Sequence, residues 1–298
     1  MRKGGLRAAL SRFQDLSRFP DMETRVMHEH LSANLANWNE RARLHATDTT
    51  GSYRIAEVLS GGSSLHAIEA GEIGDLAGLD VVHLQCHIGL DTLSLKHLGA
   101  RSVTGLDFSP DALAAARDFA ARAGTDARFV EASLYDAPAA LGAQYDFAFV
   151  TWGAINWLPD IAAWARVVAD VLRPGGRLYL LEGHPVLNQC EWRDGAPVFA
   201  YDRMTPRTQP LAFDETHTYT GDERPLTQTR TYEWIHPISD IINALISAGM
   251  RLDFLREHDL ISWEFFPGMI EVQEDLFALP PGVPRLPMSF SIGATKPL

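Results

Sequence analysis

The spacing of hydrophobic positions changes along the chain and divides it into stretches of different expected structure. From about residue 79 to 183, short apolar runs alternate with segments whose apolar residues recur at helical spacing. We expect the runs to be strands, at 80–85, 101–106, 127–132, 145–150 and 177–182. We expect the segments between them to be helices, at 90–98, 110–123 and 160–172. Strands that alternate with helices form βαβ units, in which helices cover both faces of a parallel sheet.

The stretches that flank this core have other patterns. Residues 21–46 are expected to form one long helix, within an N-terminal helical segment at 1–60 that precedes a cofactor-binding core at 61–185. Residues 186–235 are rich in Pro, Thr, aromatic and acidic residues, with short alternating runs that predict a β-rich lid insertion over the active site. In 236–298, HPISDIINALISAGM predicts a helix, and RLDFLREHDL and PMSFSIGATK predict an antiparallel hairpin that closes the sheet.

Together these patterns predict an α/β fold. Its seven-stranded, mostly parallel sheet would have helices on both faces, an N-terminal helical segment and a lid insertion in the C-terminal half of the chain.

Composition narrows the function classes. The 26 basic and 38 acidic residues give a formal charge of −12, which disfavours binding to phosphate backbones, so we expect no nucleic-acid partner. The two cysteines form no metal-binding or disulfide pattern, and we expect no metal site. We expect no membrane segment and a cytoplasmic location, because Met1 to Phe19 resembles no secretory signal and no apolar run approaches eighteen residues.

The residues at the ends of the first two strands give the clearest indication of a ligand-binding site. The first strand runs into Gln85, Cys86 and Gly89, and a small residue such as Gly89 lets backbone pass close to a ligand. Asp107 ends the second strand, at the edge where open parallel sheets bind their ligands and where a carboxylate can accept both hydroxyls of a ribose. A plain helix cap is the structural alternative for Asp107, but Ser109 and the proline after it already start the next helix. The G-x-G-x-x-G triplet of pyrophosphate-binding enzymes is missing from this loop.

Five segments of the core, in this order and spacing, resemble the class I (Rossmann-like) S-adenosylmethionine-dependent methyltransferases. They are VVHLQCHIGLDTLSLKHLGA, VTGLDFSPDAL, RFVEASLYDAP, YDFAFVTWGAINWLPD and VLRPGGRLYLLEG. The resemblance implies S-adenosylmethionine as cofactor. The acidic charge and the aromatic residues of the insertion lead us to expect a small, partly apolar metabolite as methyl acceptor. Transfer to oxygen or nitrogen is favoured over transfer to carbon, and a homodimer is compatible with the sequence.

The resemblance also implies a role for each matching position. The expected cofactor-binding residues lie at strand ends and on the N-terminal helix: Gln85, Cys86 and Gly89 beneath the methionine part, Asp107 on the ribose, Phe108 against the adenine, Ser133 and Leu134 at the adenine edge, Thr151 and Trp152 beside the methionine part, and Trp38 and Arg41 over the cofactor. Arg41 would pair with the cofactor carboxylate; a solvated helix face is the alternative for this residue.

The loop after the first strand departs from the family pattern. His83, Gln85 and His87 stand where an acidic residue and two glycines are usual, and Ser133 replaces the usual Asp at the adenine edge. These departures motivate a second hypothesis, a catalytically inactive methyltransferase-like protein that serves as a binding or scaffold protein.

One residue is a candidate general base. His184 follows the fifth strand, at the rim where the methyl group would lie, and its unperturbed pKa suits proton transfer near neutrality. The structural alternative is that His184 caps the strand or packs against the proline that follows. Asn156 and Trp157, after the fourth strand, are expected to reach the pocket.

Overall fold

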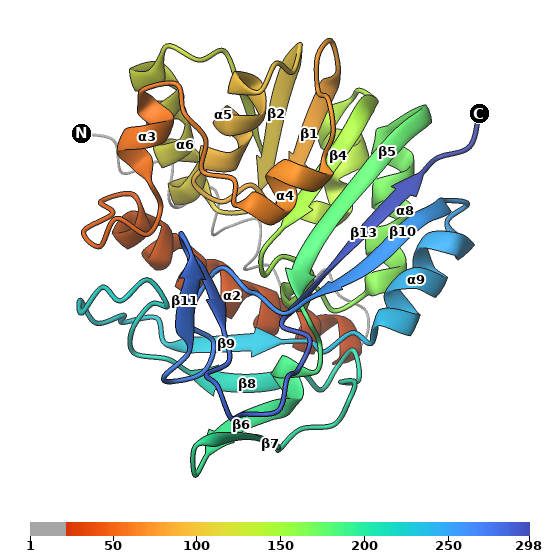
Figure 1. Cartoon of the computed structure of the whole chain (residues 1–298). Coiled ribbons are helices and arrows are strands. Elements are labelled where there is room, and N and C mark those ends of the chain that lie inside the picture. Colours follow the sequence, from red (N-terminus) through yellow and green to blue (C-terminus); the bar gives the residue numbers. More distant parts are fainter. Residues whose placement is uncertain (1–21) are drawn as a thin grey trace.

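The computed structural model describes residues 22–298, and its central sheet has seven strands in the order β10-β13-β5-β4-β1-β2-β3 (Figure 1). These strands are β1 (Asp80–Leu84), β2 (Ser102–Asp107), β3 (Arg128–Glu131), β4 (Tyr145–Thr151), β5 (Leu172–Gly183), β10 (Arg251–His258) and β13 (Ser289–Thr295). Five of them are parallel, and β13 runs antiparallel between β5 and β10. The predicted fold class, a seven-stranded and mostly parallel sheet, is therefore confirmed.

Helices cover both faces of the sheet. The helices of the described residues are α2 (Met22–His45), which lies in a separate layer, and α3 (Ile55–Leu59), α4 (Ala67–Glu72), α5 (Leu90–His97), α6 (Pro110–Ala123), α7 (Ala137–Leu141), α8 (Ile161–Val171) and α9 (Ile238–Ser247), with 3-10 turns η2 (Leu134–Asp136), η3 (Ile155–Trp157) and η4 (Leu187–Gln189). Alternate residues of a strand point to opposite faces, so Val82 and Leu84 pack in the core under α7, α8 and α9, whereas Val81 packs with Leu95 of α5 on the other face. Burial on both faces explains why these strands are near-continuous apolar runs.

The expected element boundaries agree with the structure to within one or two residues, except at β5. The Pro-Gly-Gly turn expected before this strand lies inside it, because Leu172 already pairs with Tyr145. The ladder is irregular there, with a register shift after Tyr145 and a positive φ of 80° at Gly175. The turn is thus present, as a distortion of the strand.

A second layer lies against the carboxyl edge of the sheet (Figure 1). This covering layer consists of α2, of the lid insertion at 186–235 and of residues 259–288. The lid insertion carries two hairpins, formed by β6 (Cys190–Arg193) with β7 (Ala196–Phe199) and by β8 (Leu211–Asp214) with β9 (Arg230–Glu233). The third segment, which the sequence did not predict, joins the two closing strands and contains the hairpin of β11 (Ile270–Gln273) and β12 (Leu276–Ala278).

Polar side chains on one face of α2 fix this helix to the lid insertion. The Asn34 side chain donates to the carbonyl of Tyr232 and accepts from its N–H, both at 2.8 Å, as a neighbouring strand would. One turn later, Asn37 donates to the carbonyl of Gln228, and the Glu40 carboxylate accepts the Gln228 N–H at 2.7 Å. Residues three apart share a helix face, so one stripe of α2 serves as an edge partner for β9.

Two expectations concern the ends and surfaces of the chain. Residues 1–21, which include the start of the expected N-terminal segment, lie outside the described part. Among residues 22–298, no helix is both long and apolar enough to cross a membrane.

Candidate functional site

A cavity of about 830 Å³ lies between the carboxyl edge of the sheet and the covering layer. It opens at the ends of β1 and β4, where the strand order reverses and where open α/β sheets bind their ligands. Every cofactor residue expected from the sequence lines it, namely Trp38, Arg41, Gln85, Cys86, Gly89, Asp107, Phe108, Ser133, Leu134, Thr151 and Trp152. Side chains from distant parts of the sequence thus meet in one space.

Asp107 lies buried at the end of β2, beside the β1 loop. One carboxylate oxygen accepts the backbone N–H of His87 and the other accepts that of Ser109, each at 2.8 Å. Burial raises the pKa of this carboxyl to about 6, against the lowering effect of these hydrogen bonds. Each oxygen keeps lone pairs for a further donor, so Asp107 can still bind two hydroxyl groups.

The β1 loop, residues 85–89, has a glycine-like backbone at two positions that carry other residues. Gln85 and His87 have φ values of 59° and 48°, in the left-handed region that non-glycine residues seldom adopt. At both positions the loop therefore combines a backbone that favours glycine with a large side chain. Such conformations are typical of sites held by their surroundings.

Gly89 has a packing role that was not predicted from the sequence, in addition to its place in the cavity wall. Its φ is 78°, and a Cβ atom there would lie 2.7 Å from the Ala116 Cβ of α6 and 2.8 Å from a ring carbon of Phe129. The absent side chain thus makes room for α6 and β3, so close packing of the core requires glycine at this position.

A hydrogen-bonded cluster around the buried His45 joins the β1 loop to the covering layer. His87 Nε2 lies 2.9 Å from His45 Nδ1, which also lies 2.8 Å from the Tyr53 hydroxyl. That hydroxyl bonds the Tyr219 hydroxyl of the lid insertion at 2.6 Å. Burial and the nearby Arg41 lower the pKa of His87 to about 3, so its ring is neutral at physiological pH.

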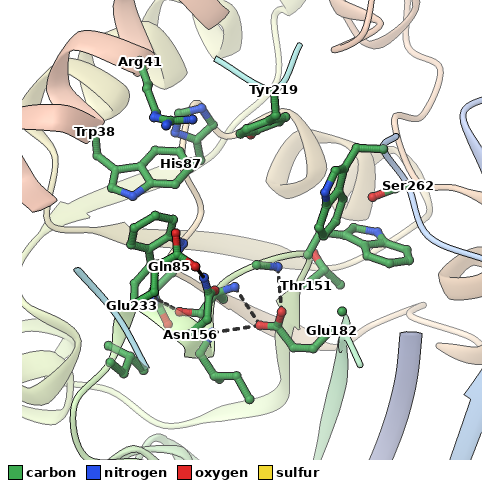
Figure 2. A pocket seen from close by; sticks show the side chains of 18 of the residues that line it. Trp38, Arg41, Gln85, His87, Thr151, Asn156, Glu182, Tyr219, Glu233 and Ser262 are labelled. Atoms are coloured by element: carbon green, nitrogen blue, oxygen red, sulfur yellow. Dashed lines mark hydrogen bonds between the residues drawn. The ribbon is translucent and has the colours of Figure 1, made fainter. Parts of the chain in front are cut away.

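Arg41 is almost fully buried, with a side chain 2% exposed, which excludes the solvated helix face considered from the sequence. Its guanidinium donates to Asn37 and forms an ion pair with Glu215, whose side chain is 48% exposed. It also lies over the rings of Trp38 and Tyr219, at 5.7 and 5.9 Å from their centroids. Figure 2 shows Trp38, Arg41, His87 and Tyr219 along one side of the cavity.

Glu182, near the end of β5, shapes the loop after β4. Its carboxylate accepts three consecutive backbone N–H groups, from Gly153 at 2.6 Å, Ala154 at 2.7 Å and Ile155 at 2.9 Å (Figure 2). Burial raises the pKa of Glu182 to about 7 despite these bonds. The carboxylate therefore acts as a fixed support for the loop that carries Asn156.

Gln85, Asn156 and Glu233 form a polar wall of the cavity. The Gln85 amide donates to the carbonyl of Ala154 at 2.8 Å, and the Asn156 amide donates to the Glu233 carboxylate at 3.2 Å. Within the described part of the chain, neither Gln85 Oε1 nor Asn156 Oδ1 receives a hydrogen bond. Burial, with the nearby Glu215 carboxylate, raises the pKa of Glu233 to about 7. Glu233 was not predicted from the sequence, because the short run of polar and aromatic residues around it does not indicate that its side chain faces a cavity.

Aromatic side chains of the covering layer line a further part of the cavity. Tyr201 and Phe213 of the lid insertion line it together with Trp263, Phe265 and Phe277 of residues 259–288. Trp263 lies edge-on to Trp152 at the end of β4, with centroids 6.1 Å apart. The covering layer thus gives this part of the cavity an apolar wall.

His184, the expected general base, is not among the residues that line the cavity. Its Nε2 lies 3.1 Å from a Glu257 oxygen on β10, and its Nδ1 accepts the backbone N–H of Val186 at 3.2 Å. Burial lowers its pKa, while Glu257 acts to raise it. This position, with both ring nitrogens in contact with protein groups, favours the capping alternative.

Metal ligation has no support in the described residues. From residue 22 onward, no three His, Cys, Asp or Glu side chains come together in a way that could hold an ion.

Comparison with known proteins shows what the core of the chain resembles. Residues 81–176 match a family model described as a methyltransferase domain. The chain is similar to the ribosomal protein L11 methyltransferase of Vibrio cholerae, at 33% identity over 136 residues, which are 40% of this chain and 44% of that protein. It is also similar to a ubiquinone biosynthesis O-methyltransferase of Xanthomonas euvesicatoria, at 31% identity over 106 residues, which are 36% of this chain and 44% of that protein. The chain therefore spans less than half the length of either relative.

The fold is shared with solved structures. An S-adenosylmethionine-dependent methyltransferase from Mesorhizobium loti superposes with a TM-score of 0.52 at 21% identity, over 76% of this chain and 95% of that one. The resemblance inferred from the five sequence segments is thus confirmed by the matched domain and by the fold.

Proposed function

Since residues 81–176 form a methyltransferase domain on the class I fold, whose cofactor is S-adenosylmethionine, we propose that the chain transfers a methyl group from this cofactor to nitrogen or oxygen of a small molecule. The observation that carries the proposal is the pairing of Asp107 with the β1 loop. Its carboxylate is held by two backbone N–H groups at the rim of the large cavity and retains the lone pairs that a ribose needs.

The residues present fit this cofactor. Phe108 and Leu134 offer apolar surface for an adenine ring next to Asp107, and the left-handed backbone at Gln85 and His87 keeps the loop open toward the cavity. Arg41 would release Glu215 and bind the cofactor carboxylate instead. Glu215 could then turn toward solvent, because about half of the Glu215 side chain is already exposed. When bound, S-adenosylmethionine supplies a methyl group that its sulfonium makes electrophilic.

The cavity supports a small acceptor. Sites for small molecules measure about 300–1,000 Å³, so a cavity of about 830 Å³ is large enough for a cofactor and a second small molecule together. The covering layer closes over this space, and its aromatic side chains suit a partly apolar body. A long polymer would require an open groove across the sheet edge, where α2 and β9 lie against each other.

The protein's contribution would be alignment and exclusion of water. Holding two reactants in line can lower the barrier by about 7–11 kcal/mol without an acid or base. The support of the Asn156 loop by Glu182 fixes one side of the site for this purpose.

Calorimetric titration of the full chain with S-adenosylmethionine and with S-adenosylhomocysteine tests the proposal, with NAD as a control ligand that also contains adenosine. We expect both methionine-derived ligands to bind and NAD to give no heat, because the loop lacks the glycines that a pyrophosphate needs. No binding of either ligand at millimolar concentration would refute the proposal and would favour a scaffold role for the fold.

A further inference from the structure

The polar wall of Gln85, Asn156 and Glu233 presents two unpaired amide oxygens and a carboxylate to the cavity. Each amide nitrogen donates one N–H, that of Gln85 to the Ala154 carbonyl and that of Asn156 to Glu233. These partners fix the orientation of both amides, because a flipped amide would place oxygen against oxygen. The amide oxygens, Gln85 Oε1 and Asn156 Oδ1, are left without a donor in the described residues.

Buried acceptors without donors are costly, at about 1–3 kcal/mol each, so native structures rarely keep them without a partner. Figure 2 shows Gln85, Asn156 and Glu233 next to each other on the cavity wall, and the hydrogen bond of Asn156 to Glu233 and that of Gln85 to Ala154 agree with this view. A ligand that brings several N–H groups to this point satisfies all three side chains. An ammonium group supplies three donors and no acceptor, whereas a hydroxyl supplies one donor.

The charged residues that line the cavity also favour a cationic ligand. Eight carboxyl groups and two guanidinium groups line it. Both guanidinium groups already have carboxylate partners, Arg41 with Glu215 and Arg54 with Glu57. An anionic acceptor would therefore meet carboxylates without a free cation from the lining residues, whereas a cationic acceptor would be attracted.

We propose that the methyl acceptor is an amine with an aromatic or apolar body, and that its nitrogen docks on Gln85, Asn156 and Glu233. This inference rests on the proposed methyltransferase function. The amine enters as an ammonium ion and gives one proton to the Glu233 carboxylate, which frees the nitrogen lone pair. The two amide oxygens hold the remaining N–H groups. The nitrogen then attacks the methyl carbon; the nitrogen–carbon bond forms as the carbon–sulfur bond breaks, and the electron pair of the broken bond stays on sulfur.

Glu233 is suited to this proton transfer by its surroundings. Burial and the nearby Glu215 raise the pKa of its carboxyl group, Arg41 acts to lower it, and the Asn156 amide donates to one of its oxygens. Its pKa of about 7 allows it to take a proton from an ammonium ion and release it near neutral pH.

Sinefungin provides a test that needs no knowledge of the acceptor. In this cofactor analogue a carbon bearing an amino group replaces the sulfonium and its methyl group, so a cationic nitrogen occupies the position of the transferred methyl. S-adenosylhomocysteine has neither group and serves as the reference. We expect the wild-type chain to bind sinefungin at least tenfold more tightly than S-adenosylhomocysteine, because a charge-assisted hydrogen bond contributes that much.

The variant Glu233→Gln keeps the size of the side chain and removes its charge. We expect it to lose the preference for sinefungin and to bind S-adenosylhomocysteine within about twofold of the wild type. Glu257→Gln is the matched control, because Glu257 pairs with His184 outside the cavity, and it should retain the preference. If neither ligand binds the wild type, the proposed function fails. If both bind with equal affinity, or if Glu233→Gln keeps the preference, the function stands and the inference is wrong.

The class of acceptor is tested with matched sets of three compounds that share an aromatic or aliphatic body and differ in bearing an amine, a hydroxyl or a carboxylate. Binding is measured by calorimetry with S-adenosylhomocysteine present. We expect an amine to bind at least tenfold more tightly than its two counterparts in at least one set, and this advantage to disappear in Glu233→Gln. If no amine binds better than its counterparts in any set, the proposal is overturned.

Discussion

Replacement of Gly89 by alanine tests whether packing or ligand approach requires glycine in the β1 loop. The new Cβ would stand 2.7 Å from Ala116 and 2.8 Å from Phe129, neither of which can yield easily, since one is a helix residue and the other a ring between elements. Overpacking of this kind costs about 1–3 kcal/mol. The left-handed backbone, with φ of 78°, adds about 1–2 kcal/mol for any residue with a Cβ. We therefore expect Gly89→Ala to lower the free energy of unfolding by about 2–5 kcal/mol.

Gly124 provides the matched control. It ends α6 with a φ of 63°, and a Cβ built there meets no atom within 4 Å. Gly124→Ala should therefore lose only the backbone contribution of about 1–2 kcal/mol. Both variants and the wild type are unfolded in urea, and the free energies are obtained by linear extrapolation. Equal destabilisation of the two variants, with loss of S-adenosylhomocysteine binding only in Gly89→Ala, would refute the packing argument and would support a glycine required by the ligand.

Three further outcomes follow from the site. Asp107→Asn should weaken S-adenosylhomocysteine binding about 10- to 100-fold in calorimetry, because an amide has one acceptor oxygen where the carboxylate has two. Unchanged affinity would show that Asp107 does not bind the ribose. Glu69 of α4 accepts the indole N–H of Trp152 at 3.0 Å, and burial raises its pKa to about 7. The folded state therefore holds this proton more tightly than the unfolded state, and stability is lost as pH rises from about 4.5 to 7. Glu69→Gln should therefore gain stability over the wild type above pH 7 and match it near pH 4.5 in urea unfolding; a difference that does not change with pH would contradict this. Asn34→Ala removes both bonds to Tyr232 and should speed amide hydrogen exchange in β9 with little change in β4, while equal protection in β9 would show that the pair does not hold the covering layer.

The core of the fold was predictable because local signals determine it. Strands buried on both faces are apolar runs, and α6 begins at Pro110 after the Ser109 cap and ends before Gly124, as the sequence indicates. The expected cofactor residues lie at strand ends or on the first helix, and the alternation of strands and helices is enough to bring the strand ends to one edge.

What the sequence did not reveal depends on contacts between distant segments. Glu233 lies in a short strand of alternating pattern, and this strand is positioned by α2, whose Asn34 pairs with Tyr232 at a separation of 198 positions. The hairpin β11–β12 has exposed residues throughout β11, so it carries no core-facing pattern. His184 follows the strand that carries Glu182, but β5 ends at Gly183, and the backbone then turns so that the His184 N–H meets the carbonyl of Met288. Proximity in sequence to a strand end did not determine the direction of that side chain.

The segment 259–288 begins and ends at neighbouring points of the sheet, because His258 and Ser289 are paired across β10 and β13. Its two ends are therefore as close as those of a hairpin turn, and the sheet would close equally well over a shorter or longer connection, whose length affects loop entropy only slowly. The lid insertion likewise leaves the sheet at the end of β5 and returns before α9. Glu233 and the aromatic side chains of the covering layer can thus be exchanged in two pieces, each attached by a single pair of junctions, while the core that carries Asp107, Gln85 and Asn156 remains untouched.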